Sequence, residues 1–213
     1  LKQKRKLIML RTGKGKGHLL DVGSGTGAFA AEMLLYSWQV TGLEPDEGAR
    51  RIAKEVNKMD LLDISHFFQL QERSYDAISL WHVLEHVHEL NNYMDQFQKL
   101  LKPDGILFIA VPNHDCVDES IYKEYWAAYD VPRHLYHFTP AVMKRLVESH
   151  GMIVKEYLPM WYDSFYISML SSRYKYGKTR LVGAFLTGLR SNWKALFNAR
   201  KCSSVIYVIK KKG

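Results

Sequence analysis

Three closely spaced glycines stand where the chain is expected to leave a buried strand and enter a helix. The segment reads Leu19-Leu20-Asp21-Val22-Gly23-Ser24-Gly25-Thr26-Gly27. Glycine tolerates positive φ and lets a ligand approach the backbone without a Cβ in between. We therefore expect Gly23, Ser24, Gly25 and Gly27 to touch a bound cofactor. With Ala28, the same turn also satisfies the dinucleotide pattern G-x-G-x-x-G/A, so it leaves two classes of ligand open.

Two carboxylates help to separate these ligand classes. Asp21 ends the first expected strand, where an acid suits a ligand with ammonium and sulfonium groups but would repel a pyrophosphate. Glu44 ends the second expected strand, where its carboxylate can accept hydrogen bonds from both ribose hydroxyls. Glu44 fits either ligand, so Asp21 favours a sulfonium nucleoside. The plainer alternative is that Asp21 only caps the turn.

A second chemical pattern follows the strand expected at Tyr75–Trp81. His82-Val83-Leu84-Glu85-His86 matches H-x-x-E-H, the motif of inverted zinc peptidases. A shared zinc needs both histidines within one helix and a further protein ligand. Because His82 directly follows a strand, the two histidines are not expected to share a helix. We therefore expect no metal site.

Apolar runs and turn residues predict the elements that position these groups. Strands are expected at His18–Val22, Gln39–Leu43, Met59–Ile64, Tyr75–Trp81, Ile106–Val111, Met152–Leu158 and Ser203–Ile209. Helices are expected at Lys2–Arg11, Ala28–Tyr36, Asp46–Asn57, Glu89–Leu101 and Pro140–His150. Met59–Ile64 has the weakest strand pattern, because it contains two aspartates. The alternation predicts an α/β fold: a doubly wound, mostly parallel seven-stranded sheet with helices on both faces.

The segment 160–202, between the last two expected strands, is far longer than a hairpin turn. Its first part has an apolar face at helical spacing, formed by Trp161, Tyr162, Phe165, Tyr166, Met169 and Leu170. A second helix is expected near Leu181–Phe197, with Arg180, Arg190 and Lys194 at polar positions. Such a basic pair of helices can cover a pocket, lie on an anionic membrane surface or form a homodimer. We expect a helical lid over a bulky or partly hydrophobic ligand.

Composition predicts one globular domain. The 213 residues are 47% hydrophobic and 24% charged, and neither a membrane span nor a signal peptide is expected. Cys116 and Cys202 are the only cysteines, so a cytoplasmic location is expected. The net charge of +8 is uneven: residues 1–17 carry +7, 18–159 carry −9 and 160–213 carry +10. These boundaries predict a basic helix and linker at 1–17, a cofactor-binding core at 18–158, the insertion at 160–202 and a last strand at 203–213.

Five elements in order resemble class I S-adenosylmethionine-dependent methyltransferases over roughly residues 18–158. They are Leu20-Asp21-Val22-Gly23-Ser24-Gly25-Thr26-Gly27, Gly42-Leu43-Glu44-Pro45, Ser74-Tyr75-Asp76-Ala77-Ile78, Val83-Leu84-Glu85-His86-Val87 and Leu100-Leu101-Lys102-Pro103-Asp104-Gly105-Ile106-Leu107. The Val83–Val87 element and Pro132–Pro140 resemble the branch that includes ubiquinone-type O-methyltransferases. The resemblance implies a Rossmann-like fold, S-adenosylmethionine as cofactor and S-adenosylhomocysteine as product.

The resemblance also implies a role for each matched position. The glycine turn would wrap the methionine portion of the cofactor, with Asp21 at its amino end and Glu44 and Pro45 at its ribose. Leu80, Trp81 and His82 would contact the methionine side. Relatives often place an aspartate beside the adenine, but the aligned stretch 65–70 has none. Phe67 is expected to stack on the adenine instead.

Methyl transfer depends mainly on alignment of the acceptor and exclusion of water. A hydroxyl acceptor also benefits from a base that titrates near neutral pH, which histidine does. The loops after the fourth and fifth expected strands should face the methyl group, so His86, His134 and His137 are the candidates. Each can instead tie loops together. Trp126, Tyr129 and Arg133 are expected to line the acceptor site, although Arg133 can equally clamp the loop.

The expected function is methylation of an oxygen or nitrogen atom on a small-molecule acceptor. An RNA or tRNA methyltransferase is an alternative because both ends are basic, although the middle of the chain is acidic and no RNA-binding module is recognisable. A cofactor-binding protein without catalysis is a second alternative. A nicotinamide oxidoreductase is a third, and Asp21 disfavours it.

Overall fold

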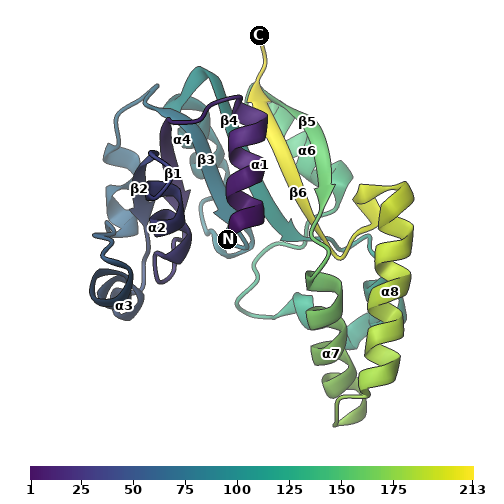
Figure 1. The fold of residues 1–213 in the computed structure, drawn as a ribbon. Coiled ribbons are helices and arrows are strands. Elements are labelled where there is room, and N and C mark those ends of the chain that lie inside the picture. The colour runs from purple at the N-terminus through teal and green to yellow at the C-terminus, as the bar shows by residue number, and fades with distance from the viewer.

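The computed structural model describes residues 1–213, and its six strands form one mixed sheet (Figure 1). The strands are β1 His18–Val22, β2 Gln39–Leu43, β3 Tyr75–Trp81, β4 Leu101–Pro112, β5 Met152–Pro159 and β6 Ser204–Lys211. Their order is β2-β1-β3-β4-β6-β5, with β6 antiparallel to both neighbours and the other pairs parallel. The chain winds outward from β1 in both directions, so the carboxyl ends of β1 and β3 flank a switch point, the usual ligand position in such sheets.

Helices cover both faces of the sheet. The longer helices are α1 Lys2–Thr12, α2 Ala28–Leu34, α3 Glu47–Asn57, α4 Leu90–Leu100 and α6 Pro140–Ser149. On one face, α1 and α2 contribute Ile8 and Met33 to a buried apolar cluster. On the other, α4 and α6 contribute Phe97 and Val147 to the larger cluster. This confirms the Rossmann-like architecture. No helix combines the length and apolar character needed to span a membrane.

The sheet has six strands, not the seven predicted. Met59–Ile64 is not a strand, and only Leu62 forms an isolated bridge, to Leu43. The aspartates explain the difference. The carboxylate of Asp60 pairs with Lys54, while Asp63 accepts a hydrogen bond from the Ser65 amide and caps the 3₁₀ helix Ile64–Gln69. Side chains that bond the local backbone compete with strand pairing.

The other predicted elements are present, with small differences at their ends. Local signals account for several boundaries. The Asp46 side chain accepts a hydrogen bond from the Ala49 amide at the start of α3, and the Thr139 hydroxyl accepts one from Val142 at the start of α6. The central strand β4 is longer than predicted and begins at Leu101.

The parallel strands β1 to β4 have their carboxyl ends at one end of the sheet, here called the carboxyl edge, and their amino ends at the other, the amino edge. The insertion forms a helical hairpin beyond the carboxyl edge (Figure 1). It consists of α7 Asp163–Tyr176 and α8 Leu181–Phe197, which pack on each other and on α5 Val117–Tyr122. The buried Asp118 carboxylate fastens the hairpin to the core. It accepts hydrogen bonds from the Ser191 hydroxyl of α8 at 2.9 Å and from the Ser203 hydroxyl at 2.7 Å.

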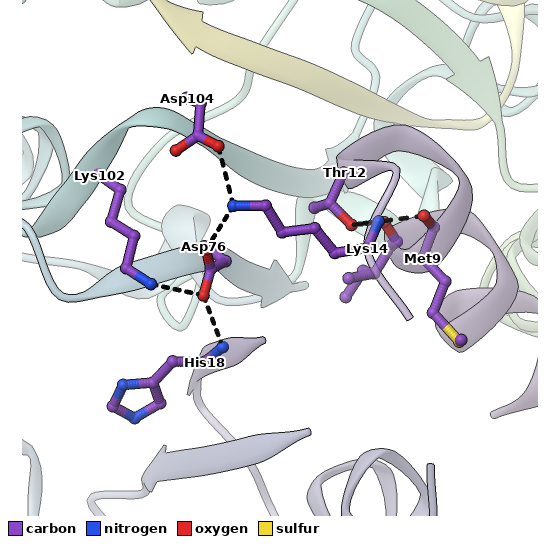
Figure 2. Close-up of polar contacts among 8 residues, drawn as sticks. Met9, Thr12, Lys14, His18, Asp76, Lys102 and Asp104 are labelled. Carbon is purple, nitrogen blue, oxygen red and sulfur yellow. Dashed lines mark hydrogen bonds and ion pairs between the residues drawn. The ribbon is translucent and has the colours of Figure 1, made fainter. Parts of the chain in front are cut away.

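An ion network holds the linker between α1 and β1 at the amino edge of the sheet (Figure 2). The Asp76 carboxylate on β3 accepts hydrogen bonds from Lys14 Nζ at 2.6 Å, Lys102 Nζ at 2.8 Å and the His18 amide at 2.8 Å. Lys14 also donates to Asp104 at 2.8 Å. Burial alone would raise the pKa of Asp76, but these donors outweigh it and lower the pKa to about 2. The network thereby anchors the linker that carries α1.

Candidate functional site

The glycine turn between β1 and α2 leaves room for a ligand. Gly23 and Gly25 have φ angles of 71° and 55°. A Cβ on Gly23 would lie 2.4 Å from Cγ2 of Val83, whereas a Cβ on Gly25 would meet no atom within 4 Å. Gly23 therefore lets the turn pack against the segment after β3, and Gly25 borders open space. The Ser24 hydroxyl donates to the Asp21 carbonyl at 2.8 Å and so helps to shape the turn itself.

Asp21 is a buried carboxylate beside this turn. Asp21 is 2% exposed, and its Oδ1 accepts a hydrogen bond from the Ser79 hydroxyl at 2.6 Å. Burial raises the pKa of Asp21 to about 6, although the hydrogen bond from Ser79 and the charge of Lys4 act in the opposite direction. A carboxylate with so little compensation gains from a cationic ligand group.

Glu44, at the end of β2, reaches the same turn. Its Oε2 accepts a hydrogen bond from the Gly25 amide at 2.7 Å, and its Oε1 accepts one from the Asp46 amide at 3.0 Å. Each carboxylate oxygen can accept a further hydrogen bond. Pro45 next to it is exposed, and its carbonyl accepts a hydrogen bond from Arg50. Glu44 is thus fixed against the glycine loop with acceptor capacity left.

Lys4 of α1 lies near this edge, and sequence reasoning missed it. Its Nζ is 4.5 Å from the centre of the Trp81 ring. Burial lowers the pKa of Lys4, while the charges of Asp21 and Asp163 partly restore it. Lys4 and Trp81 line a cavity of about 540 Å³ between α1 and the segment Leu158–Asp163. Leu80 is fully buried within the sheet, where it pairs with Val22 of β1 and Ile109 of β4. The concentration of lysines at 1–17 was the only sequence signal for Lys4.

His82 is held between two carboxylates directly after β3. Its backbone has φ 58°, a conformation that non-glycine residues seldom adopt. Its Nε2 lies 2.8 Å from Asp163 of α7, and its Nδ1 lies 3.3 Å from Glu85. Burial opposes a charge on His82, but hydrogen bonds and charges from Asp163 and Glu85 outweigh it and raise the pKa to about 9. The positively charged His82 ring therefore links the end of β3 to the insertion through its ion pair with Asp163. The signal for Asp163 was present, because it is the only acid in 160–213.

A cavity of about 380 Å³ lies between this edge and α7. His82, Glu85 and Pro112 line it from the sheet side. Tyr166, Ile167, Leu170 and Tyr174 line it from α7, and Asp130, Arg133 and His134 line it from the loop before α6. The cavity is partly apolar and contains three carboxylates, counting Asp163. Its size and mixed lining suit a small organic molecule.

Glu85, His86 and His134 converge beside the cavity. Glu85 is 1% exposed, and its carboxylate has no close hydrogen-bond donor, only the His82 ring at 3.3 Å. His86 Nδ1 lies 2.9 Å from the Arg133 carbonyl, and His134 Nδ1 lies 2.8 Å from the Ala128 carbonyl. A carbonyl only accepts, so each Nδ1 carries a proton, and in the neutral form of such a ring Nε2 is an acceptor. Burial lowers the pKa of His134, which favours its neutral form.

These three side chains could also hold a metal ion, since their ligand atoms lie within 4.8 Å of one another. The histidines come from a 3₁₀ turn, Leu84–His86, and from the distant loop before α6, not from one helix. The arrangement therefore differs from the helical zinc motif considered in the sequence.

Besides His86, which lies beside the cavity but is absent from its wall, four predicted site residues do not lie where the sequence predicted them. Trp126 is buried and its Nε1 donates to Asp118 at 2.9 Å, so it belongs to the packing between α5 and the insertion. The Tyr129 hydroxyl donates to Glu119 at 2.9 Å. His137 is exposed, and its Nε2 lies 2.9 Å from the Tyr129 carbonyl. These three are absent from the cavity wall, which corrects the prediction that Trp126 and Tyr129 line it.

The fourth is Phe67, whose predicted stacking on adenine does not agree with the structure. Its side chain is fully buried. The centre of its ring lies 4.6 Å from that of Tyr93, on which it stacks, and 5.2 Å from that of Phe97. Both partners belong to α4, so the ring serves the core of the protein. Arg133 does line the cavity but is mostly exposed, and its guanidinium pairs with Asp130 at 2.6 Å.

Comparison with known proteins shows which family these elements belong to. A family model described as a methyltransferase domain matches residues 2–156. Ubiquinone biosynthesis O-methyltransferase of Vibrio atlanticus (strain LGP32) is 34% identical over 104 residues, which cover 46% of this chain and 44% of the relative. That of Pelagibacter ubique (strain HTCC1062) is 30% identical over 100 residues, covering 45% and 42%. The matches thus span less than half the length of these curated relatives.

Solved structures show the same fold at low sequence identity. A putative sarcosine dimethylglycine methyltransferase from Galdieria sulphuraria aligns with a TM-score of 0.66 at 15% identity, covering 99% of this chain and 86% of that one. The 1,6-didemethyltoxoflavin-N1-methyltransferase of Burkholderia thailandensis, solved with S-adenosylhomocysteine, aligns with a TM-score of 0.62 at 15% identity, covering 99% and 77%. Together with the family match and the five sequence elements, they lead to one conclusion: this chain belongs to the class I S-adenosylmethionine-dependent methyltransferase domain family.

Proposed function

We propose that this protein transfers the methyl group of S-adenosylmethionine to a small molecule held in the 380 Å³ cavity. One observation carries the proposal: the segment His82–Glu85 contributes to both halves of the site. Val83 packs against Gly23 of the glycine turn, while His82 and Glu85 line the cavity. A cofactor on the turn and an acceptor in the cavity would therefore meet across this segment.

The residues at the carboxyl edge fit the cofactor chemically. Asp21 offers a buried anion to its cationic methionine end, and Glu44 offers acceptor capacity to its ribose. Lys4, partly buried over Trp81, is suited to the methionine carboxylate. When bound, the cofactor supplies an electrophilic methyl group. The protein's contribution is to bind, to align and to keep water out.

Glu85 and His134 are suited to receive a proton from the acceptor. The Glu85 carboxylate and the Nε2 atom of His134 can each accept a hydrogen bond at the cavity, and the donor nearest to Glu85 is the His82 ring at 3.3 Å. A hydroxyl or amine on the acceptor would supply a further donor. The apolar wall from α7 favours an acceptor with a hydrophobic part, which gives the insertion the role of a lid.

Isotopically labelled methyl donor tests the proposal. The full chain is incubated with the donor and a metabolite extract, and labelled products are identified by mass spectrometry. We expect a labelled small molecule that wild type produces and Glu85→Gln does not. A suitable control is His137→Gln, which alters an exposed histidine outside the cavity and should retain the product. Label that appears in RNA, or no label in any product, would contradict the proposal.

A further inference from the structure

The last helix of the insertion has its apolar side turned outward. On one side of α8, small residues pack inward: Ala184, Gly188, Ser191 and Ala195 are buried. Phe165 lies so close that a Cβ on Gly188 would be 2.6 Å from its Cδ1. The opposite side carries large apolar side chains, here called the α8 apolar face. It comprises Val182, Phe185, Leu186, Trp193, Leu196 and Phe197, which are between 55% and 79% exposed.

The α8 apolar face is too extensive to be ordinary surface. Single exposed apolar residues are common, but a continuous apolar patch marks a contact with another surface. The face continues onto α7, where Phe165 and Met169 join Phe185 and Leu186 around a shallow, wholly apolar hollow of about 380 Å³. No segment of the described chain covers it.

Charge indicates which surface would cover it. Arg173, Lys175, Lys178, Arg180, Arg190 and Lys194 lie on the hairpin, and none of them forms an ion pair. The single acid of the insertion, Asp163, is turned inward to His82. At 100° per residue, Arg190 and Lys194 follow directly after the apolar arc on α8. The outer side of the hairpin thus combines exposed aromatic and aliphatic groups with cations.

A second copy of the chain is a poorer partner than an anionic bilayer. In a two-fold dimer through this face, the same patch would meet itself. The cations would then face one another without an acid of the hairpin to pair them. An anionic lipid surface instead accepts both components, because apolar side chains enter the headgroup boundary while lysine and arginine contact phosphate.

We propose that the α8 apolar face docks this protein on an anionic membrane surface. Phe185, Trp193 and Phe197 enter the interfacial region, and Arg190 and Lys194 contact lipid phosphates. The helix lies in the plane of the surface and does not cross the bilayer, in keeping with its 17 residues. This inference does not depend on which acceptor is methylated.

Vesicle co-sedimentation of the full chain tests this inference. Phosphatidylcholine vesicles with phosphatidylglycerol are compared with phosphatidylcholine alone. We expect binding to the anionic vesicles that weakens with added salt. Each basic residue near an anionic surface contributes about fivefold in partitioning, so Arg190→Glu with Lys194→Glu should reduce binding more than tenfold. Phe185→Ser with Trp193→Ser and Phe197→Ser should reduce it by at least as much.

Two control variants make the same kinds of substitution at exposed positions outside the hairpin. Leu35→Ser removes an apolar side chain that is 80% exposed near α2, and Lys155→Glu reverses an exposed charge on β5. Both should bind vesicles as wild type does. Thermal unfolding checks that each variant is folded. Absence of wild-type binding to phosphatidylglycerol vesicles, or equal binding to neutral vesicles that Arg190→Glu with Lys194→Glu leaves unchanged, would overturn the proposal. So would a wild-type dimer in light scattering that the Phe185, Trp193 and Phe197 substitutions dissociate, without vesicle binding.

Discussion

Two buried aspartates at opposite edges of the sheet have opposite properties. Asp76, at the amino edge, is 5% exposed and accepts hydrogen bonds from two lysines and an amide, and its pKa falls to about 2 (Figure 2). Asp21, at the carboxyl edge, is 2% exposed and receives a side-chain hydrogen bond from Ser79, and its pKa rises to about 6. One carboxylate is fully compensated within the protein, and the other is not.

This difference distinguishes a structural edge from a binding edge. At the amino edge, every charge of the Asp76 network has a partner, which fixes the linker. At the carboxyl edge, Glu85 is also buried, and apart from the His82 ring at 3.3 Å its oxygens lack hydrogen-bond partners. A buried charge without hydrogen bonds or an opposite charge lowers the stability of the fold, and such groups are concentrated at sites where a ligand stabilises them. This difference supports the proposal that the cofactor and the acceptor bind at the carboxyl edge.

The largest expected effect concerns turnover at the carboxyl edge. Glu85→Gln keeps the side-chain shape but removes the basic carboxylate, so turnover of a hydroxyl acceptor should fall about 100-fold or more. The affinity for S-adenosylhomocysteine should remain near that of wild type. Initial rates and calorimetry on one preparation measure both. If chelator abolishes wild-type turnover and Mn²⁺ restores it, the cluster of Glu85, His86 and His134 holds a metal, and the proton role is wrong.

Asp21→Asn should separate binding from stability. The raised pKa means that Asp21 costs stability increasingly as the pH rises from about 4 to about 6, with the full cost present above that. An amide still accepts the Ser79 hydrogen bond, so the variant should be more stable at pH 8 by about 1–3 kcal/mol. Its affinity for S-adenosylhomocysteine should fall about tenfold. Denaturant unfolding and calorimetry test both, and unchanged affinity would argue against the role of Asp21.

Asp76→Asn should lower the stability of the fold and leave the affinity for S-adenosylhomocysteine unchanged, the reverse of the result expected for Asp21→Asn. The lowered pKa means that the Asp76 network stabilises the fold above about pH 4 and is lost as the pH falls through about 2. Its lysine partners are about one-third exposed, so solvent screening limits the expected loss to about 1–2 kcal/mol at pH 7. Affinity for S-adenosylhomocysteine should not change. A large loss of affinity in a folded variant would show that the two edges are coupled.

The smallest effect is expected where the insertion meets the sheet. The raised pKa of His82 means that its pairing with Asp163 stabilises the fold fully below about pH 6.5 and is lost as the pH rises through about 9. Asp163→Asn should therefore cost about 1 kcal/mol at pH 7 and little at pH 10. Thermal unfolding at both pH values measures the difference. An equal loss at both would mean that the contact is not ionic.

Local patterns predicted much of this edge correctly, and long-range packing explains what they missed. The glycine turn, the strands β1, β2 and β3 and the helix α8 follow from signals within a few residues. The pairing of His82 with Asp163 joins residues far apart in sequence, and no local pattern encodes it. Phe67 has the residue type for adenine stacking, but Tyr93 and Phe97 from α4 take its ring into the core. Likewise, the hydrogen bond from Trp126 to the buried carboxylate of Asp118 holds Trp126 in the interior.

Calorimetric titration of wild-type protein with S-adenosylhomocysteine tests the central claim most directly. The carboxyl edge should bind one molecule per chain, and Asp21→Asn and Glu44→Gln should each weaken binding, while Asp76→Asn should not. A nicotinamide dinucleotide should produce no heat, because a pyrophosphate would meet the charge of Asp21. Tight binding of the dinucleotide together with no heat from S-adenosylhomocysteine would contradict the account.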